Sequence, residues 1–494
     1  MSKKFKTLVS LLLVAIMLAS CSESTVNDET ADNADSSNIN ATESQSETEE
    51  ETEYKAFSEI NVEKYDGRAL NLMASPNDER QIDIVVEELN GSTLNDAIYQ
   101  RNKAMEDIFD IRMNCVANVD CYVGQIIDKN VLAGSMEYDF YFGNIVDDTV
   151  GYMLKGDFLD INKLSEVNLN NQWWDQTART GLSIGNRNFL VTGDISPTSL
   201  LASEAILFNK QLFDNYGIEE PYDMVFEGTW TLDAMASLID KMNIDLDGDG
   251  VINTDKDLLS YIGWSPDCCC ALFYGAGGYY SEKDENDNPY ISYDQEKVVN
   301  IFEKIGKITN HSNAFLGTGG ATEHVALFNI FKEGRAFFCG IQFWKVDLFL
   351  REMEDDYGIL PEPKYDEAQA EYSTGLNDHV PMIIVPVNIA EGDMPFVGKM
   401  IEAMGAYNFD NVTPIMYDVI AGSRNVRDEK SAEIVNIIIR NRAYDYELYM
   451  HSDFSQTIIV TNKCENVVSF LQSSAKVASK IMEKNVKALS SVEE

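Results

Sequence analysis

The stretch that decides the fold class is residues 111–143, which read IRMNCVANVDCYVGQIIDKNVLAGSMEYDFYFG. Residues 111–116 and 138–143 predict two strands, and residues 123–132 predict a helix between them. A strand, a helix and a strand at this spacing indicate a βαβ unit within a mainly parallel sheet. The predicted fold class is therefore α/β.

The same alternation extends in both directions from this stretch. Residues 69–74 predict a further strand, and residues 94–108 predict a helix. Residues 231–242 predict another helix, with Thr231 at its N-cap. The last predicted helix has one apolar face, formed by Val467, Phe470, Leu471, Ser474, Ala475, Ala478, Ile481 and Met482. Two α/β lobes without a glycine-rich nucleotide loop favour a ligand cleft between the lobes.

The N-terminus predicts a signal peptide over residues 1–20. Three lysines stand before the apolar residues 8–18, a run too short to cross a membrane as a helix. The following LASC, residues 18–21, resembles the lipobox of bacterial lipoproteins, and this resemblance implies that Cys21 carries the lipid. The alternative is an ordinary secretory signal followed by an unrelated cysteine. We expect a protein held on the outer face of the cell membrane by acyl chains alone.

Residues 21–60 are assigned to the lipidated cysteine and a tether. Residues 22–53 contain eleven acidic residues, no basic ones and almost nothing apolar. Such a segment cannot bury enough apolar surface to offset the entropy lost on ordering it. We therefore expect an extended, self-repelling linker.

The formal net charge of the chain is −44 at pH 7. A protein this acidic repels nucleic acid and anionic lipid headgroups, so neither is an expected partner. The charge favours a neutral or cationic ligand. The alternative is that the acidity only keeps a surface protein in solution.

Cysteine usage is unusual for an exported protein. Seven cysteines remain besides Cys21, and an odd number without regular spacing does not describe a disulfide framework. Cys115 and Cys121 are near enough in sequence to pair locally, but we expect mostly free thiols. The consecutive cysteines at 268–270 lack the spacing of a zinc site and predict buried packing.

A series of short segments runs in a consistent order through nearly the whole mature chain. The segments are YDF at 138–140, GDFLDI at 156–161, AILFNK at 205–210, YGI at 216–218, GTWT at 228–231, F at 331 with GRAFFCG at 334–340, YGILPEP at 357–363 and RDEKS at 427–431. Together they resemble the extracellular solute-binding proteins of sugar ABC importers, the maltose-binding-like family.

This resemblance implies two α/β lobes, each assembled from two stretches of chain and joined by crossing segments, with a ligand held between them. On this basis we assign residues 61–160 and 336–380 to the N-terminal lobe, and residues 161–335 and 381–494 to the C-terminal lobe. The resemblance also implies an oligosaccharide ligand, ABC permease subunits as partners and a monomeric protein. A peptide, a polyol or another solute is the alternative ligand.

Five aromatic residues are candidates for stacking on the apolar face of a sugar, which needs large contact at a low entropic cost. Trp173 and Trp174 lie in the amide-rich sequence NNQWWD, and the alternative is that they form a packing pair. Trp344 follows the return strand, where members of the family often place a ligand-stacking aromatic. Trp264 and Tyr279, which lies in a GGYY turn, complete the set.

Three polar residues are candidates for contacts to ligand hydroxyls. Asp139 and Asn144 are assigned to the cleft edge at the end of a strand, and Glu204 to the second crossover. In an open α/β sheet, ligands meet the carboxyl ends of strands. The alternative for each residue is a solvated loop position or a cap.

Residues 245–257, DLDGDGVINTDKD, match an EF-hand-type calcium loop through position 9. Position 12 is Lys256 where the motif has glutamate, so we assign the last ligand to Asp257, with Asp255 as the other candidate. The predicted Ca²⁺ has a structural role, and the alternative is an acidic loop without metal. The predicted ligands are Asp245, Asp247, Asp249, the carbonyl of Val251, Asn253 and Asp257.

We expect a binding protein and not an enzyme. The sequence has no nucleophile elbow, zincin signature, phosphate loop or kinase motif set, and its four histidines are scattered. One alternative is a surface glycosidase, which needs two carboxylates about 5–10 Å apart. The other is a carbohydrate-sensing lipoprotein that is not coupled to a transporter.

Overall fold

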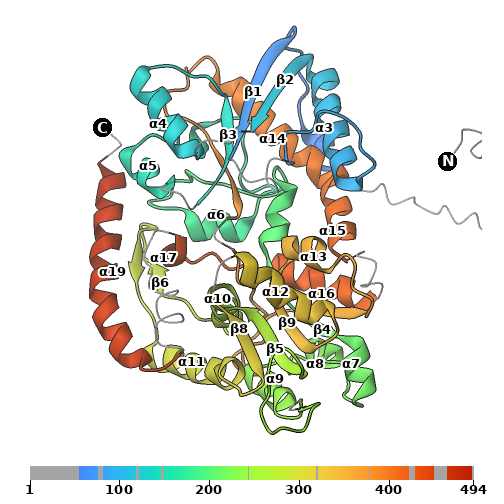
Figure 1. Ribbon diagram of the computed structural model, residues 1–494. Coiled ribbons are helices and arrows are strands. Elements are labelled where there is room, and N and C mark those ends of the chain that lie inside the picture. The colour runs from blue at the N-terminus through green and yellow to red at the C-terminus, as the bar shows by residue number, and fades with distance from the viewer. Residues whose placement is uncertain are drawn as a thin grey trace, which may run out of the picture. The chain divides into compact units, whose positions relative to one another are not determined.

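The computed structural model describes residues 55–75, 82–117, 122–145, 149–242, 244–318, 321–377, 379–421, 429–449 and 464–491 (Figure 1). The chain divides into Met1–Glu53 and Tyr54–Glu494, and every described residue belongs to the second part. The predicted signal peptide, Cys21 and nearly all of the predicted tether lie outside the described residues, as does Cys121.

The first sheet has the strand order β11-β3-β1-β2. Its strands are β1 (Arg68–Ala74), β2 (Ile111–Ala117), β3 (Phe140–Asn144) and β11 (Pro381–Ile384). β1 pairs in parallel with β2 and β3, and β11 pairs antiparallel with β3. The three strands predicted near the N-terminus are confirmed, with shifts of one or two residues at their ends.

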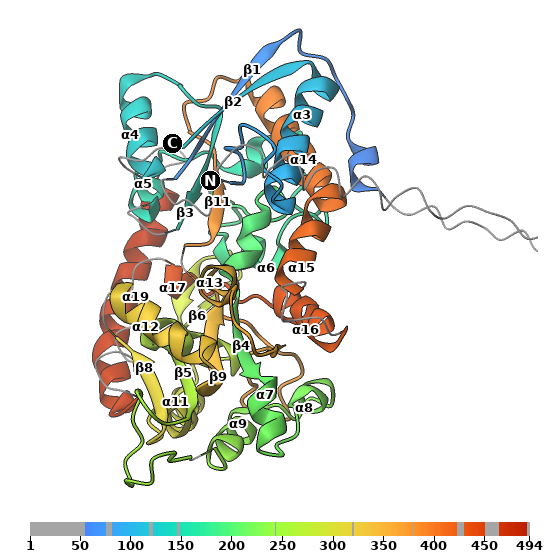
Figure 2. The same ribbon diagram turned by 45° about the vertical axis from the view of Figure 1, so that its right-hand side comes forward.

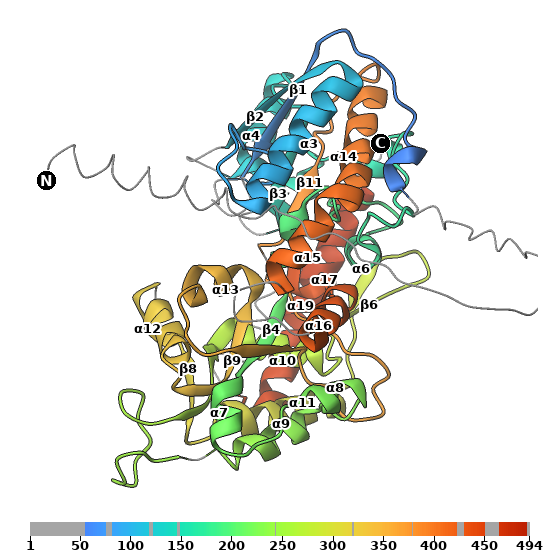
Figure 3. The same cartoon turned by 90° about the vertical axis from the view of Figure 1, so that its right-hand side faces the viewer.

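Both faces of the first sheet are covered, because successive side chains of a strand point to opposite faces. Leu72 and Phe140 lie in a core with α3 (Thr93–Phe109) and α14 (Met394–Asn411). Figure 3 shows these two helices side by side over the sheet. The core of the other face includes residues of α4 (Val123–Ala133) and α5 (Thr149–Lys155). We call this sheet and its helices the first lobe.

The second sheet has the order β10-β4-β9-β5-β8 and, with its helices, forms the second lobe. β5 runs parallel to β8 and β9, whereas β4 runs antiparallel to β9 and β10. Every residue of β4, β9 and β10 is buried, as is typical of strands covered on both faces. The strands are β4 (Glu204–Asn209), β5 (Leu259–Trp264), β8 (Ala314–Gly317), β9 (Ala336–Gln342) and β10 (Tyr357–Leu360).

The helices of the second lobe share one hydrophobic core with this sheet. The predicted N-cap is confirmed, because the Thr231 hydroxyl accepts a hydrogen bond from Ala234 N at 3.2 Å. The helices are α7 (Lys210–Asn215), α8 (Tyr222–Phe226), α9 (Leu232–Ile239), α10 (Ser265–Gly275), α11 (Gln295–Thr309), α12 (Ala321–Lys332), α13 (Phe343–Leu350) and α16 (Glu429–Arg440).

The remaining elements are short or lie where the chain passes between the lobes. η3 (Pro197–Ala202) leads into β4, and α15 (Thr413–Ala421) follows α14 on the way to α16 (Figure 2). A hairpin of β6 (Ser281–Lys283) and β7 (Pro289–Ile291) extends from the second lobe. The others are η1 (Ala56–Glu59), η2 (Ile161–Lys163), α6 (Gln176–Leu182), α17 (Tyr446–Tyr449) and α19 (Val467–Ser490).

The final helix, α19, packs on both lobes. Val467 and Leu471 belong to the second-lobe core, whereas Met482 and Leu489 belong to the first-lobe core that contains α4 and α5. Its predicted apolar face is largely buried, but Ile481 is 36% exposed. Among the described residues, no helix combines the length and the apolar character that a membrane span requires.

The lobe boundaries predicted from sequence are wrong in three places. β9 and β10, within residues 336–380, join the second sheet, whereas β11 and α14, after residue 380, return to the first lobe. Residues 161–195 also pack in the first lobe, through Ile161, Trp173 and Phe189. Apolar strand sequences show that a strand is buried, but they do not show which sheet it joins.

The six described cysteines, which include Cys115, are free, in agreement with the expectation of free thiols. Cys268 and Cys269 are each 2% exposed in the second-lobe core. The consecutive cysteines therefore contribute to packing, as predicted.

Candidate functional site

Polar and aromatic residues gather where β5 and β9 end, at one edge of the second sheet. Trp264 is the last residue of β5, and Gln342 is the last residue of β9. Glu204 is the first residue of β4, but it pairs with Gln342 because β4 runs antiparallel to β9. The carboxyl ends of parallel strands are where α/β folds place ligands. We call Glu204, Trp264, Asp267, Gln342, Trp344 and Lys345 the strand-end cluster.

Hydrogen bonds hold the polar members of this cluster in place. Gln342 Nε2 donates to a carboxylate oxygen of Glu204 and, at 2.8 Å, to Asp267 Oδ2. Lys345 Nζ donates to the same Asp267 oxygen at 3.0 Å, and its side chain is only 3% exposed. Gln342 Oε1 is buried and has no hydrogen-bond partner among the described residues.

The aromatic members lie beside these polar groups. The rings of Trp264 and His324 meet edge to face, with their centroids 3.7 Å apart. Trp344 is half-buried at the start of α13, and Lys345 Nζ lies 5.2 Å from its ring. Both tryptophans were predicted as ligand contacts, and the fold brings them to the same sheet edge.

His324 is a site residue that the sequence did not reveal. Its Nε2 is buried without a partner among the described residues, and burial together with the Lys345 ammonium lowers the pKa of the imidazole. His324 comes from α12, which reaches Trp264 because β8, just before it, pairs with β5. That pairing is a tertiary feature without a local sequence signal.

A second carboxylate lies buried near Glu204. Glu362 is 1% exposed, and burial followed by the nearby Glu204 charge raises the pKa of its carboxyl well above the usual range. Burial therefore favours the neutral form of Glu362. Within the cluster, Lys345 pairs with Asp267, and Gln342 links Asp267 to Glu204.

The expectation that Trp173 and Trp174 stack on a ligand is wrong in this structure. They are 1% and 3% exposed, and Trp174 Nε1 donates to Glu402 Oε2 at 3.0 Å. A Cβ added at Gly405 of α14 would lie 2.8 Å from Trp173, so the helix packs directly on the indole. The neighbouring Asn171 also binds Glu402, which means that the amide-rich setting serves packing inside the first lobe.

Asp139 and Asn144 lie at opposite ends of β3. Asn144 ends the strand, at the edge where β1 and β2 also end, and it is 2% exposed. Asp139 precedes the strand and accepts a hydrogen bond from Asn71 N at 2.7 Å. The assignment of Asp139 to the cleft edge is therefore wrong, because the amino end of a parallel strand faces the other way.

Tyr279 lies apart from the strand-end cluster. It is 40% exposed and lines a pocket of about 300 Å³ together with residues of α6, β6 and the stretch 442–446. No residue that lines this pocket belongs to the strand-end cluster.

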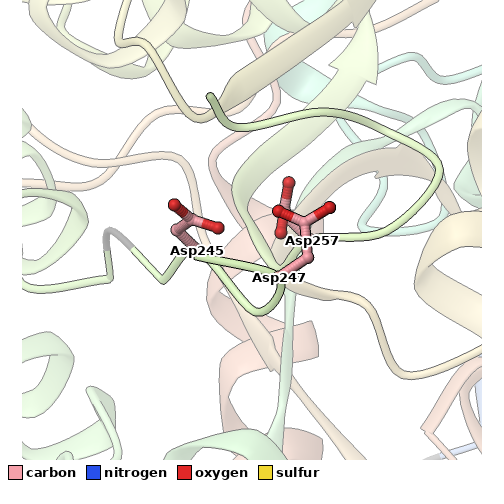
Figure 4. Close-up of side chains that lie close together, drawn as sticks. All are labelled: Asp245, Asp247 and Asp257. Carbon is pink, nitrogen blue, oxygen red and sulfur yellow. The ribbon is translucent and has the colours of Figure 1, made fainter. Parts of the chain in front are cut away.

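Part of the predicted calcium loop gathers its carboxylates. Asp245, Asp247 and Asp257 each offer an oxygen, and these oxygens lie within 4.8 Å of one another (Figure 4). Gly248, at φ 71°, lies in the left-handed region, which allows the sharp turn between the first two carboxylates and the rest of the loop. Lys256 Nζ lies 3.0 Å from Asp247 Oδ2.

The other predicted ligands bind the loop's own backbone. Asp249 accepts from Val251 N at 2.8 Å, and the Asn253 side chain accepts from Lys256 N at 3.0 Å. Asp257 accepts from Asn253 N at 2.9 Å and is fully buried. The loop is therefore closed by its own hydrogen bonds around the three gathered carboxylates.

Buried carboxylates also hold the crossing segments. Asp83 Oδ1 accepts from Thr198 N at 3.1 Å, and Asp194 Oδ1 accepts from the Thr413 hydroxyl at 2.6 Å. Burial raises the pKa of Asp83 to about 6 and that of Asp194 to about 7. The first contact ties η3 to the first lobe, and the second ties two crossing segments together.

Comparison with solved structures shows the fold. An ABC transporter solute-binding protein from Thermotoga lettingae, bound with α-D-tagatose, matches with a TM-score of 0.51 and 12% identity, over 84% of this chain and 100% of that one. RafE from Streptococcus pneumoniae matches with a TM-score of 0.51 and 12% identity, over 84% and 99%. The cyclic α-maltosyl-1,6-maltose binding protein from Arthrobacter globiformis matches with a TM-score of 0.53 and 10% identity, over 86% and 99%.

No family model matches the sequence, and no curated protein matches it either. The chain has the two-lobed α/β fold of ABC transporter solute-binding proteins, and the predicted fold class is thereby confirmed.

Proposed function

We propose that this protein captures a neutral oligosaccharide outside the cell and delivers it to an ABC importer. The observation that carries the proposal is the strand-end cluster, where Trp264 and Trp344 stand beside Glu204, Asp267 and Gln342 on one sheet edge. Aromatic faces with a few fixed polar groups are what sugar recognition requires. Two proteins of this fold are described as bound with tagatose and as binding a cyclic maltosyl-maltose.

The ion pair at Asp267 favours a neutral ligand over a cationic one at that carboxylate. Asp267 is already paired with Lys345 at 3.0 Å, and burial favours the neutral form of Glu362. Although the chain as a whole is acidic, the Asp267 carboxylate therefore has an ion-pair partner.

Calorimetric titration with maltooligosaccharides and raffinose tests the proposal. We expect saturable binding that Trp344→Ala weakens tenfold or more, while the melting temperature of the ligand-free protein stays nearly unchanged, because Trp344 is only half-buried. Leu348→Ala, an exposed position on the same helix, is the matched control and should bind as the wild type does. Equal weakening in both variants, or hydrolysis of the bound sugar, would contradict the proposal.

Coupling to an importer distinguishes capture for import from the alternative of a sensing lipoprotein. We propose that the protein acts as a monomer and that ABC permease subunits are its partners. Deleting its gene should abolish uptake of the bound labelled sugar. Unchanged uptake with an altered transcriptional response would favour the sensing role.

The proposed location rests on Cys21, and the lipid is the proposed sole attachment to the membrane. Cys21→Ala should release the protein into the medium and abolish incorporation of labelled palmitate. Retention in the membrane fraction would contradict the anchor while leaving the binding proposal intact.

We also propose that residues 245–257 bind Ca²⁺ as a structural clamp. Oxygens of three carboxylates lie within 4.8 Å of one another, the Lys256 ammonium contacts Asp247, and oxygen ligands are those that Ca²⁺ prefers. After chelation, adding millimolar CaCl₂ should raise the melting temperature, and Asp247→Asn should remove most of that rise. Asp214→Asn, exposed and outside the loop, is the control, and an unchanged wild-type melting temperature would end the calcium proposal.

A further inference from the structure

The pocket beside Tyr279 is built from both lobes. It measures about 300 Å³ and is lined by residues of α6, of the stretch 279–283 and of the stretch 442–446 (Figure 1). Ala178 of α6 packs in the first-lobe core, whereas Tyr280 packs in the second-lobe core. We call this cavity the seam pocket.

Hydrogen bonds hold the walls of the pocket, and the one from Lys283 crosses from the second lobe to the first. Lys283 Nζ, on β6, donates to Ser183 O at 2.6 Å, just after α6. Tyr444 OH donates to Asp175 Oδ2 at 3.1 Å, and Arg442 Nη2 lies 2.6 Å from the same oxygen. The pocket is thus formed before any ligand binds, which reduces the ordering cost of binding.

Two buried polar atoms at the pocket lack a partner among the described residues. They are the Tyr446 hydroxyl and Arg442 Nε, on residues that are 3% and 7% exposed. An unsatisfied buried donor destabilises the protein, so a ligand that accepts its hydrogen bond binds more tightly. Each of the two atoms is a donor that a hydroxyl oxygen can satisfy.

The two cationic side chains at the pocket, Lys283 and Arg442, are already paired. Arg442 is paired with Asp175, and Lys283 with Asp287 at 3.1 Å. Asp445 accepts hydrogen bonds from Tyr280 N at 2.8 Å and from the Ser281 hydroxyl. An anionic ligand would find no unpaired cation among these residues, whereas a neutral hydroxylated one meets hydroxyls and the half-exposed ring of Tyr279.

We propose that the seam pocket is a second binding site, distinct from the strand-end cluster, for a neutral polyhydroxylated molecule the size of a monosaccharide. Because its walls come from both lobes, a bound molecule stabilises the arrangement in which they meet. Occupancy of the seam pocket is thereby coupled to lobe movement and to ligand binding at the strand-end cluster.

Calorimetric titration of the Trp344→Ala protein with D-glucose, D-galactose and ribitol tests the site, because this variant lacks the stacking tryptophan of the strand-end cluster. We expect saturable binding of at least one of the three compounds, with a stoichiometry near one. Tyr446→Phe in this background should weaken the binding at least fivefold, since it removes only the unpaired hydroxyl. Folding is preserved, because that hydroxyl makes no hydrogen bond within the described residues.

Tyr216→Phe, a 43% exposed tyrosine on the second lobe, is the matched control and should leave the affinity unchanged. An absence of saturable binding, or an affinity that Tyr446→Phe leaves within twofold, overturns the second site. Oligosaccharide binding to the wild-type protein is measured separately. Its loss in Trp344→Ala and retention in Tyr446→Phe would show that the oligosaccharide binds at the strand-end cluster and not in the seam pocket, so failure of one proposal is distinguishable from failure of the other.

Discussion

At the scale of single residues, the environment of a tryptophan decides its role more than its neighbours in sequence do. Trp173 stands among amides yet is 1% exposed in the first-lobe core, whereas Trp344 is half-buried at a sheet edge. The amide-rich sequence around the first residue binds Glu402 of α14 through Asn171 and Trp174. Polar residues beside a tryptophan therefore indicate a polar binding partner, which here is the Glu402 side chain of α14 and not a ligand.

This contrast predicts different costs for the two truncations. Trp173→Ala should lower the free energy of unfolding by about 3–5 kcal/mol, because it leaves a cavity beneath α14. Trp344→Ala should cost less than about 1 kcal/mol, because that side chain has less buried contact to lose. Urea unfolding of the two variants measures both values, and equal losses would mean that Trp344 also belongs to the core.

At the scale of elements, the crossing segments carry ionisable groups that titrate near neutral pH. Asp83 and Asp194 have folded-state pKa values of about 6 and about 7, raised by burial from 3.8. The folded protein therefore holds these protons more tightly than the unfolded chain does. The stability that protonation of these groups contributes is complete below about pH 4 and is lost as pH rises through their folded pKa values.

Unfolding measured between pH 5.5 and pH 8 tests this linkage. The free energy of unfolding of the wild type should fall across this range more steeply than that of Asp194→Asn, because asparagine keeps a neutral side chain at the position. Asp214→Asn, on an exposed helical position, should retain the wild-type slope. Parallel slopes for wild type and Asp194→Asn would show that Asp194 titrates below this range.

At the scale of the whole molecule, α19 connects the two lobes. Leu471 lies in the second-lobe core and Leu489 in a first-lobe core, and Arg187 Nη1 donates to Leu489 O at 3.1 Å. Figures 1 and 2 show the helix passing from beside α11 to α5. Because α19 packs in the cores of both lobes, the unfolding of one lobe removes contacts that stabilise the other.

Removing residues 479–494 should weaken this connection. Scanning calorimetry should give one transition for the wild type and two resolved transitions for the truncated protein, with the first-lobe transition at the lower temperature, because Met482 and Leu489 leave its core. A single transition shifted as a whole would show that the crossing segments alone couple the lobes.

Local patterns predicted the strands and helices well. The runs at 69–74, 111–116 and 138–143 are strands, because side-chain alternation and helical periodicity are properties of the chain within one element. The motif at 245–257 likewise predicted the three carboxylates that lie close together, because they are near one another in the sequence of a single tight loop.

The sequence by itself determined the α/β class, most element positions and the aromatic residues at 264 and 344 as candidates for ligand contact. Only the tertiary structure decided that β9 and β10 belong to the second sheet, that Trp173 is core, and that His324 reaches Trp264. The physical reason is that periodicity records whether a side chain is buried, whereas strand pairing between distant segments selects its partner. A site assembled from the ends of several strands is therefore visible only once that pairing is known.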